Sequence, residues 1–259
     1  NWDSYVSVIV TGQDDDVADG PQSFEVQIDS IVSEDSKYSV LQVDPIKLKN
    51  EDDEVVAIVL GTLSGDTSES SGGTATFTVK ISSKPLETVT IPLSSSDTTE
   101  GNVSSSSLSF GSDNYSTAQT ITITGQDDSE RDGDIAYKIN IGPTSSSSTP
   151  YNRVSALTHS ITNMDNETSG VTVSPTNIST NETGTTANFT VKLDTKPSAD
   201  VTINLGSTDP GEANINISYL TFTTSNYSTP QTVTVTGVDD GLADGSQTST
   251  IQLFPINGS

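Results

Sequence analysis

Short runs of the chain alternate between polar and apolar residues. Residues 76–81 read TFTVKI, residues 88–93 read TVTIPL and residues 120–123 read TITI. A period of two with one polar face, rich in Val, Ile, Thr and Phe, is the signature of half-buried antiparallel strands. Clusters of Ser, Gly, Asp and Asn separate these runs, and no stretch has the apolar spacing of a helix. The pattern therefore predicts an all-β fold.

The chain also repeats itself over a long period. The segment VTGQDDDVADG at residues 10–20 returns as ITGQDDSERDG at 123–133 and as VTGVDDGLADG at 235–245. The first glycines of the three segments are 113 and 112 residues apart. A period of about 112 residues is the size of one domain, so the sequence predicts tandem modules of this length.

Each module is expected to be an immunoglobulin-like antiparallel β-sandwich of seven strands. In the register of the repeat, residues 1–54 are the C-terminal half of a β-sandwich module, 55–167 are a complete module, and 168–259 are a module that lacks its last strand. Within the complete module the expected strands are 55–63, 74–82, 88–95, 107–110, 119–125, 135–142 and 158–163. A half module cannot bury its sheet faces or pair its edge strands, so upstream sequence or another chain is expected to complete residues 1–54.

Acidic residues fall at corresponding places in the modules. Because successive strands run in opposite directions, the loops after the first, third and fifth strands share one pole with the segment after the seventh. Acids in these places are expected to converge on a metal site. The candidate ligands are Asp14, Asp15, Asp19, Glu51, Asp52 and Asp53 in the first module, Glu69, Asp97, Asp127, Asp128, Asp132 and Asp165 in the second, and Glu182, Asp209, Asp239, Asp240 and Asp244 in the third. Glu54 and Glu167 stand beside them after the seventh strands.

Composition favours calcium as the metal. The chain has 35 Asp and Glu against 10 Lys and Arg, a formal net charge of -25, with 1 His and no Cys. Gathered carboxylates repel one another and need a cation, and an all-oxygen ligand set suits Ca²⁺ better than Zn²⁺ or copper. Mg²⁺ fits less well because it tends to keep several waters. Two alternatives stay open on the residues alone: a solvated acidic surface, and Asp residues that only form turns.

Four segments resemble Calx-beta modules, and more closely the tandem Calx-beta-like repeats of large bacterial surface proteins. They are ESSGGTATF at 69–77, SSDTTEG at 95–101, PQTVTVTGVDD at 230–240 and NEDD at 50–53. The resemblance implies a Ca²⁺-binding sandwich. Its ligands would come from the Glu after the first strand, the Asp after the third, the acids after the fifth and those after the seventh.

One segment departs from that family pattern. After its seventh strand the complete module reads NMDNE at residues 163–167, with Met164 and Asn166 where the family usually has acids. This departure implies that the site of the complete module holds fewer ions, or holds them more weakly, than the site with Glu51, Asp52 and Asp53.

Several classes of function are disfavoured by the same features. A strongly negative chain without clustered cations is a poor partner for nucleic acid. No apolar run approaches the roughly 20 residues of a bilayer span, so no membrane insertion is expected. His159 is the one histidine, and neither a Gly-rich phosphate loop nor a nucleophile elbow occurs, so no enzyme activity is expected.

We therefore expect a non-enzymatic extracellular repeat at the cell surface, a Ca²⁺-stiffened rod, filament or stalk segment of a surface protein. Its expected partners are neighbouring modules or copies of itself, including a strand from a neighbouring chain that completes the third module and builds a fibre. Two alternatives remain. One is an adhesin module that binds a glycan or a neighbouring cell, and the other is a spacer attached to a catalytic domain.

Overall fold

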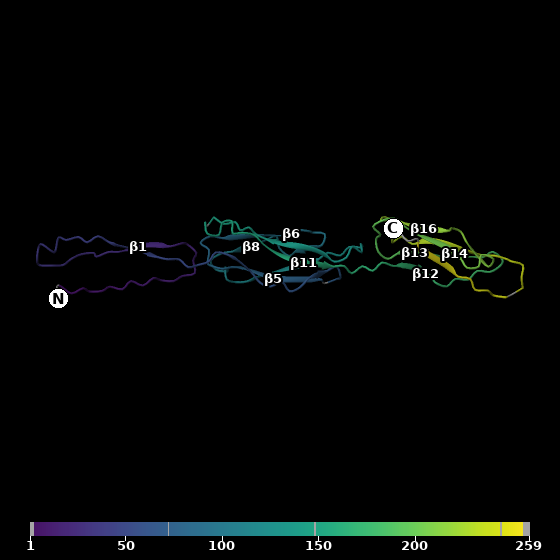
Figure 1. Ribbon diagram of the computed structural model, residues 1–259, viewed down its shortest axis with the longest axis horizontal. Helices are drawn as coiled ribbons and strands as arrows, with labels where there is room; N and C mark the ends of the chain where they lie inside the picture. The colour runs from purple at the N-terminus through teal and green to yellow at the C-terminus, as the bar shows by residue number, and fades with distance from the viewer. Residues whose placement is uncertain (1–2, 72, 148, 244, 256–259) are drawn as a thin grey trace. The chain divides into compact units, whose positions relative to one another are not determined.

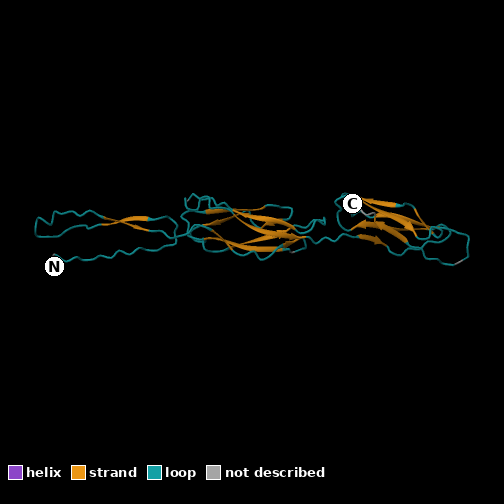
Figure 2. Cartoon of the chain, viewed as in Figure 1, coloured by secondary structure: helices purple, strands orange, loops and turns teal. Residues whose placement is uncertain are grey.

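The computed structural model describes residues 3–71, 73–147, 149–243 and 245–255. Within these ranges every regular element is a strand, and paired strands run antiparallel, which confirms the all-β sandwich class (Figure 2). None of these residues forms a helix long and apolar enough to cross a membrane.

The strands are numbered in chain order, as labelled in Figure 1. They are β1 (Gln22–Val26), β2 (Ile46–Asn50), β3 (Ile58–Leu60), β4 (Thr67–Ser68), β5 (Thr74–Ile81), β6 (Val89–Ser95), β7 (Gly101–Val103), β8 (Ser107–Phe110), β9 (Gln119–Gly125), β10 (Ile135–Ile141), β11 (Leu157–Met164), β12 (Val171–Ser174), β13 (Thr186–Leu193), β14 (Val201–Ser207), β15 (Ala213–Ile215), β16 (Tyr219–Phe222), β17 (Gln231–Gly237) and β18 (Ile251–Pro255).

The first part of the chain holds a single strand pair. β1 and β2 run antiparallel, with Gln22 opposite Asn50 and Val26 opposite Ile46. Many of its large apolar side chains are exposed: Val6 is 88% exposed, for example. No second sheet covers this pair among the described residues, as expected for half of a sandwich. The assignment of residues 1–54 to half a module stays a prediction.

The middle of the chain forms a sandwich of two sheets. One has the strand order β3-β5-β9-β7 and the other β4-β11-β10-β6-β8. Alternate residues of β5 point inward, and Phe77 lies opposite Ile121 of β9 in the register. Phe110 and Ile139 from the other sheet are fully buried in the same core. The period-two pattern of the sequence is therefore the inward face of these strands.

A second sandwich follows with the same plan. Its sheets have the orders β12-β13-β17-β15 and β16-β14-β18, around a core that includes Phe189, Phe222 and Val233. β18 pairs with β14, whereas its counterpart β10 lies between β6 and β11. β18 thus has one strand neighbour among the described residues, and completion of this sheet by a strand from another chain stays a prediction.

By their contacts the strands belong to two compact units. Unit 1 comprises Asn1–Thr67, Gly72–Gln126 and Ala136–Asn163, and unit 2 comprises Ser68–Ser71, Asp127–Ile135 and Met164–Ser259. The loop between β9 and β10 therefore belongs to the same unit as the second sandwich. The module boundaries at residues 54 and 167, and the module length, stay predictions.

Candidate metal centre

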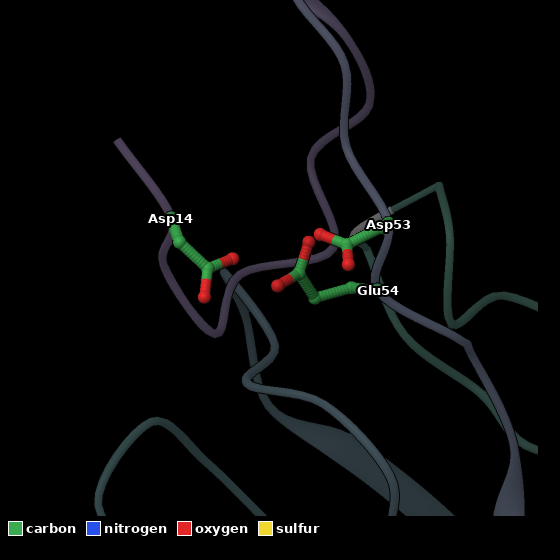
Figure 3. A group of neighbouring side chains, drawn as sticks. All are labelled: Asp14, Asp53 and Glu54. Atoms are coloured by element: carbon green, nitrogen blue, oxygen red, sulfur yellow. The ribbon is translucent and has the colours of Figure 1, made fainter. Parts of the chain in front are cut away.

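Cluster 1, formed by Asp14, Asp53 and Glu54, gathers three carboxylates in unit 1. One oxygen from each lies within 4.8 Å of the others. Asp14 belongs to the segment before β1, and Asp53 and Glu54 follow β2, so the antiparallel pairing of these two strands brings the segments together. In Figure 3 the carboxylates of Asp14 and Glu54 point toward one another from the two segments.

The same acids line a surface cavity of about 240 Å³. Every candidate ligand of the first module lines this cavity. No Lys or Arg is among the described residues that line it. The acidic lining residues are Asp14, Asp15, Asp19, Glu51, Asp52, Asp53 and Glu54. Glu54, which stands next to the candidate set in sequence, is thus an additional member of the site.

Hydrogen bonds hold the two segments around cluster 1. Asn50 Nδ2 donates to the carbonyl oxygen of Gln13 at 2.8 Å. Asp52 accepts from two backbone N–H groups, through Oδ1 from Glu54 at 3.0 Å and through Oδ2 from Gly20. Asp52 thus ties the segment after β2 to the segment before β1.

The acids of cluster 1 repel one another in the absence of a cation. The pKa of Glu54 is raised from its ordinary 4.5 to about 7, first by a hydrogen bond with the Asp52 carboxyl, then by burial and by the charges of Asp52 and Asp53. The same hydrogen bond, with the Glu54 N–H bond, lowers the pKa of Asp52. Without a cation, a second negative charge beside Asp52 is therefore unfavourable.

Cluster 2, formed by Glu69, Asp165 and Glu167, lies in unit 2. Its carboxylate oxygens are also within 4.8 Å of one another. Glu69 follows β4, is only 5% exposed, and donates its N–H to the Met164 carbonyl at 3.1 Å. The Asn166 N–H donates to Glu69 Oε2 at 3.4 Å. Glu167 Oε2 is buried without a hydrogen-bond partner, an arrangement that is costly unless a cation binds there.

Cluster 2 is framed by the same three hydrogen bonds as cluster 1. Asn163 Nδ2 donates to the Gln126 carbonyl at 2.9 Å. Asp165 accepts the Gly133 N–H through Oδ2 at 2.8 Å and the Glu167 N–H through Oδ1 at 2.7 Å. Each of these residues occupies the repeat position of its counterpart in the first segment. The same framework is thus built twice from separate parts of the sequence.

Burial dominates the electrostatics of cluster 2. It raises the pKa of Glu69 to about 8, assisted by a hydrogen bond with Glu167 and by the charges of Glu167 and Asp128. Loss of hydration, then the charges of Asp128 and Asp165, raise the pKa of Asp132 as well. The Glu167 N–H is the main cause of the lowered pKa of Asp165. Like cluster 1, this site holds more negative charge than it can neutralise by itself.

Several candidate ligands serve mainly to form turns. Asp15 Oδ1 accepts the N–H two residues ahead at 2.7 Å, and Asp128 Oδ1 does the same at 2.6 Å. Asp97 Oδ1 accepts the N–H and hydroxyl of Thr99, which lower its pKa. Asp127 accepts the side-chain amide of Asn166 at 3.1 Å. One oxygen of Asp15, Asp97 and Asp128 is thus used within its own turn, as the turn-forming interpretation expects, whereas the Asp127 bond joins two distant segments.

The third set of candidates does not form a comparable cluster. Asp209, Asp239 and Asp240 are exposed, and each accepts the N–H two residues ahead, at 3.1, 3.0 and 2.8 Å. Glu182 is exposed and lines a separate cavity. Asp244 lies outside the described residues. Within the described part of the chain only clusters 1 and 2 bring three carboxylates together.

Two buried polar residues of unit 1 were not among the candidates. Glu100 is 7% exposed and accepts the Asn163 side-chain amide at 3.3 Å. Asn163 is 1% exposed, and its Oδ1 has no hydrogen-bond partner. The signal in the sequence is the repeated Asn at the end of the strand before the exit acids, which recurs as Asn50.

The pKa of Glu69 predicts how stability depends on pH in a chelator. Its folded-state pKa is about 8 against an ordinary 4.5, so the folded state holds the proton more tightly than the unfolded state. This contribution to the free energy of unfolding is complete below about pH 4.5 and is lost as pH rises through about 8. Urea titrations in EDTA across this interval should show the decline, and Glu69→Gln should make it shallower. A rise in stability across the interval would contradict the assignment.

No protein-family model matches the chain, and no curated protein matches it. Among solved structures, CBD12 from CALX1.2 is 14% identical over 74% of this chain and 77% of that chain, with a TM-score of 0.34. Domains 1–6 of the surface layer protein SbsC are 17% identical over 86% of this chain and 29% of that chain, with a TM-score of 0.32. Similarities of this size do not assign the chain to either family.

Proposed function

We propose that the chain is a non-enzymatic, extracellular segment of a surface protein, in which Ca²⁺ binds the carboxylate clusters and stiffens the junctions between consecutive β-sandwich repeats. The observation that carries the proposal is the duplicated acidic framework. Clusters 1 and 2 combine the same three hydrogen bonds with three converging carboxylates. A solvated acidic surface would not require the same arrangement twice.

The geometry of the clusters suits calcium. Ca²⁺ binds oxygen at about 2.3–2.6 Å, so two oxygens on one ion lie no more than roughly 4.6–5.2 Å apart. The oxygens of both clusters fall within 4.8 Å of one another. Cluster 2 also buries a carboxylate oxygen of Glu167 that has no hydrogen-bond partner. Asp165, Glu69 and Glu167 would supply the ligands there, with Asp14, Asp53 and Glu54 at cluster 1.

Calcium at such sites would act on rigidity more than on folding. Extracellular sites with Kd of about 10⁻⁴ to 10⁻³ M contribute roughly 1 kcal/mol at millimolar Ca²⁺. The two hydrophobic cores do not include the cluster residues, so they persist when the metal is removed. The junctions would therefore loosen before the sandwiches unfold.

Small-angle X-ray scattering with Ca²⁺ and with EDTA tests this role. We expect the distribution of interatomic distances to lose its longest distances in EDTA, because loosened junctions let the chain bend. The circular dichroism spectrum should stay that of a β protein. An unchanged distance distribution, together with measurable Ca²⁺ binding by calorimetry, would leave a metal site without the stiffening role. Absence of calcium binding would refute the proposal altogether.

A further inference from the structure

The acidic loop at residues 13–20 makes a second contact through its backbone. In unit 1 the Lys84 N–H donates to the Asp16 carbonyl oxygen at 2.7 Å. Val17 and Lys84 form an isolated parallel β-bridge. Lys84 lies in the turn between β5 and β6 and precedes Pro85. A backbone contact thus joins this loop to a turn of the middle sandwich.

The same contact occurs in unit 2 with different side chains. The Lys196 N–H donates to the Ser129 carbonyl oxygen at 2.8 Å, and Glu130 and Lys196 form a parallel bridge. Lys196 lies in the turn between β13 and β14 and precedes Pro197. Each residue is offset by the repeat period from its counterpart in unit 1. Because the loop residues differ between the copies, the contact depends on backbone atoms and not on particular side chains of the loop.

An Asp side chain shapes each loop for this contact. Asp15 accepts the Val17 N–H, and Asp128 accepts the Glu130 N–H. The third loop has the same bond, from the Leu242 N–H to Asp240 at 2.8 Å, although Leu242 is in no β-bridge among the described residues. The third loop therefore has this bond with no docked turn among the described residues, and the bond accounts for Asp15 and Asp128, which clusters 1 and 2 leave unused.

Side chains reinforce the two contacts by different chemistry. In unit 1 the Tyr115 hydroxyl donates to Asp16 Oδ2 at 3.0 Å. In unit 2 Lys196 Nζ pairs with Glu130 Oε1, and this pairing raises the pKa of Lys196. One reinforcement is a hydrogen bond from a neutral donor and the other is an ion pair, so only the second is expected to weaken with salt.

We propose that each acidic loop is a docking surface whose partner is the Lys-Pro turn of the sandwich that follows it in the sequence, and that this docking needs no metal. In the first loop the Asp14 carboxylate belongs to cluster 1, while the backbone at residues 16–17, and at 129–130 in the second loop, receives the turn. The contact fixes which turn meets which loop, and it stands independently of the calcium proposal.

Disulfide trapping tests the proposal directly, because the chain has no Cys of its own. Two double variants place Cys at the bridged positions, Val17→Cys with Lys84→Cys and Glu130→Cys with Lys196→Cys. A β-bridge holds two Cα atoms within the roughly 4.4–6.8 Å that a disulfide requires. In the matched controls the second Cys lies four residues earlier, within the preceding strand. These controls carry Lys80→Cys in unit 1 and Lys192→Cys in unit 2.

Each variant is oxidised with glutathione disulfide, in EDTA and in millimolar Ca²⁺, and the linked peptides are identified by mass spectrometry. We expect intramolecular disulfides at both bridged pairs to form at least about tenfold faster than at the control pairs, because held groups react much faster than free ones. The rate should be similar in EDTA. Bridged pairs no faster than controls, linkage at only one pair, or linkage only with Ca²⁺ would each overturn the proposal. If the protein bound no calcium, fast disulfide formation in EDTA would still support the docking proposal.

Discussion

Replacing Phe77 with alanine is expected to lower the free energy of unfolding of the middle sandwich by about 3–5 kcal/mol. Phe77 is 2% exposed and lies opposite Ile121 in the β5–β9 register. Its ring packs against the His159 ring in a T-shaped arrangement, with centroids 4.8 Å apart. Removing the ring leaves a cavity between the two sheets that the surrounding strands can fill only in part.

Urea unfolding followed by circular dichroism measures this loss. Phe77→Leu is the matched control, since a substitution that keeps most of the volume should cost less than about 1.5 kcal/mol. Phe189 holds the corresponding position in the core of the second sandwich, so Phe189→Ala should shift a different transition. If Phe77→Ala and Phe189→Ala moved one and the same transition equally, the two cores would not be separate folding units.

The sequence predicted the strands well because each carries its own alternation. The observed β5, β6, β8, β9, β10 and β11 begin and end within one residue of the expected ranges. β3 is shorter than the expected 55–63, since only Ile58–Leu60 has ladder partners on β5. Ala57 instead donates its N–H to the Ser82 hydroxyl. β4 and β7 were not predicted, because two or three residues are too few to show a period.

Strand direction predicted that some acids of the loops meet, but not what each acid does. Glu69 and Asp165, far apart in sequence, converge as strand direction predicted. Asp97 instead bonds Thr99, and Asp15 and Asp128 bond their own turns. An Asp in a loop can bind a cation or accept a nearby N–H, and its rotamer decides between them. The residue pattern contains no information on that rotamer.

The Asn at the end of the seventh strand has a role that the sequence analysis did not predict. Asn50 and Asn163 each donate to the first carbonyl of the acidic loop, which positions the loop beside the exit acids. Neither residue carries charge, so a search for metal ligands passes over them. Their role depends on a contact between segments about 37 residues apart, which the repeat alone does not reveal.

Replacing Glu69 with glutamine is expected to weaken Ca²⁺ binding at cluster 2 by roughly tenfold or more. Loss of a residue that only hydrogen-bonds to a metal ligand can already lower metal affinity by this factor. The substitution keeps the shape of a side chain that is 5% exposed and removes one negative charge. In the metal-free protein, by contrast, the same substitution is expected to be stabilising. Near pH 8 the variant should be more stable than the parent, because it removes the buried negative charge whose loss of hydration raises the pKa of Glu69.

Calorimetric titration with Ca²⁺ and thermal unfolding in EDTA measure the two effects on the same protein. Glu182→Gln is the matched control, because Glu182 lies in the corresponding loop of the second sandwich but is exposed and belongs to no three-carboxylate cluster in the described residues. It should leave both measurements near those of the parent. A purely structural Glu69 would lose stability on substitution with or without calcium. The opposite signs are therefore specific to a carboxylate placed for a cation, and equal calcium affinity in parent and variant would exclude Glu69 as a ligand.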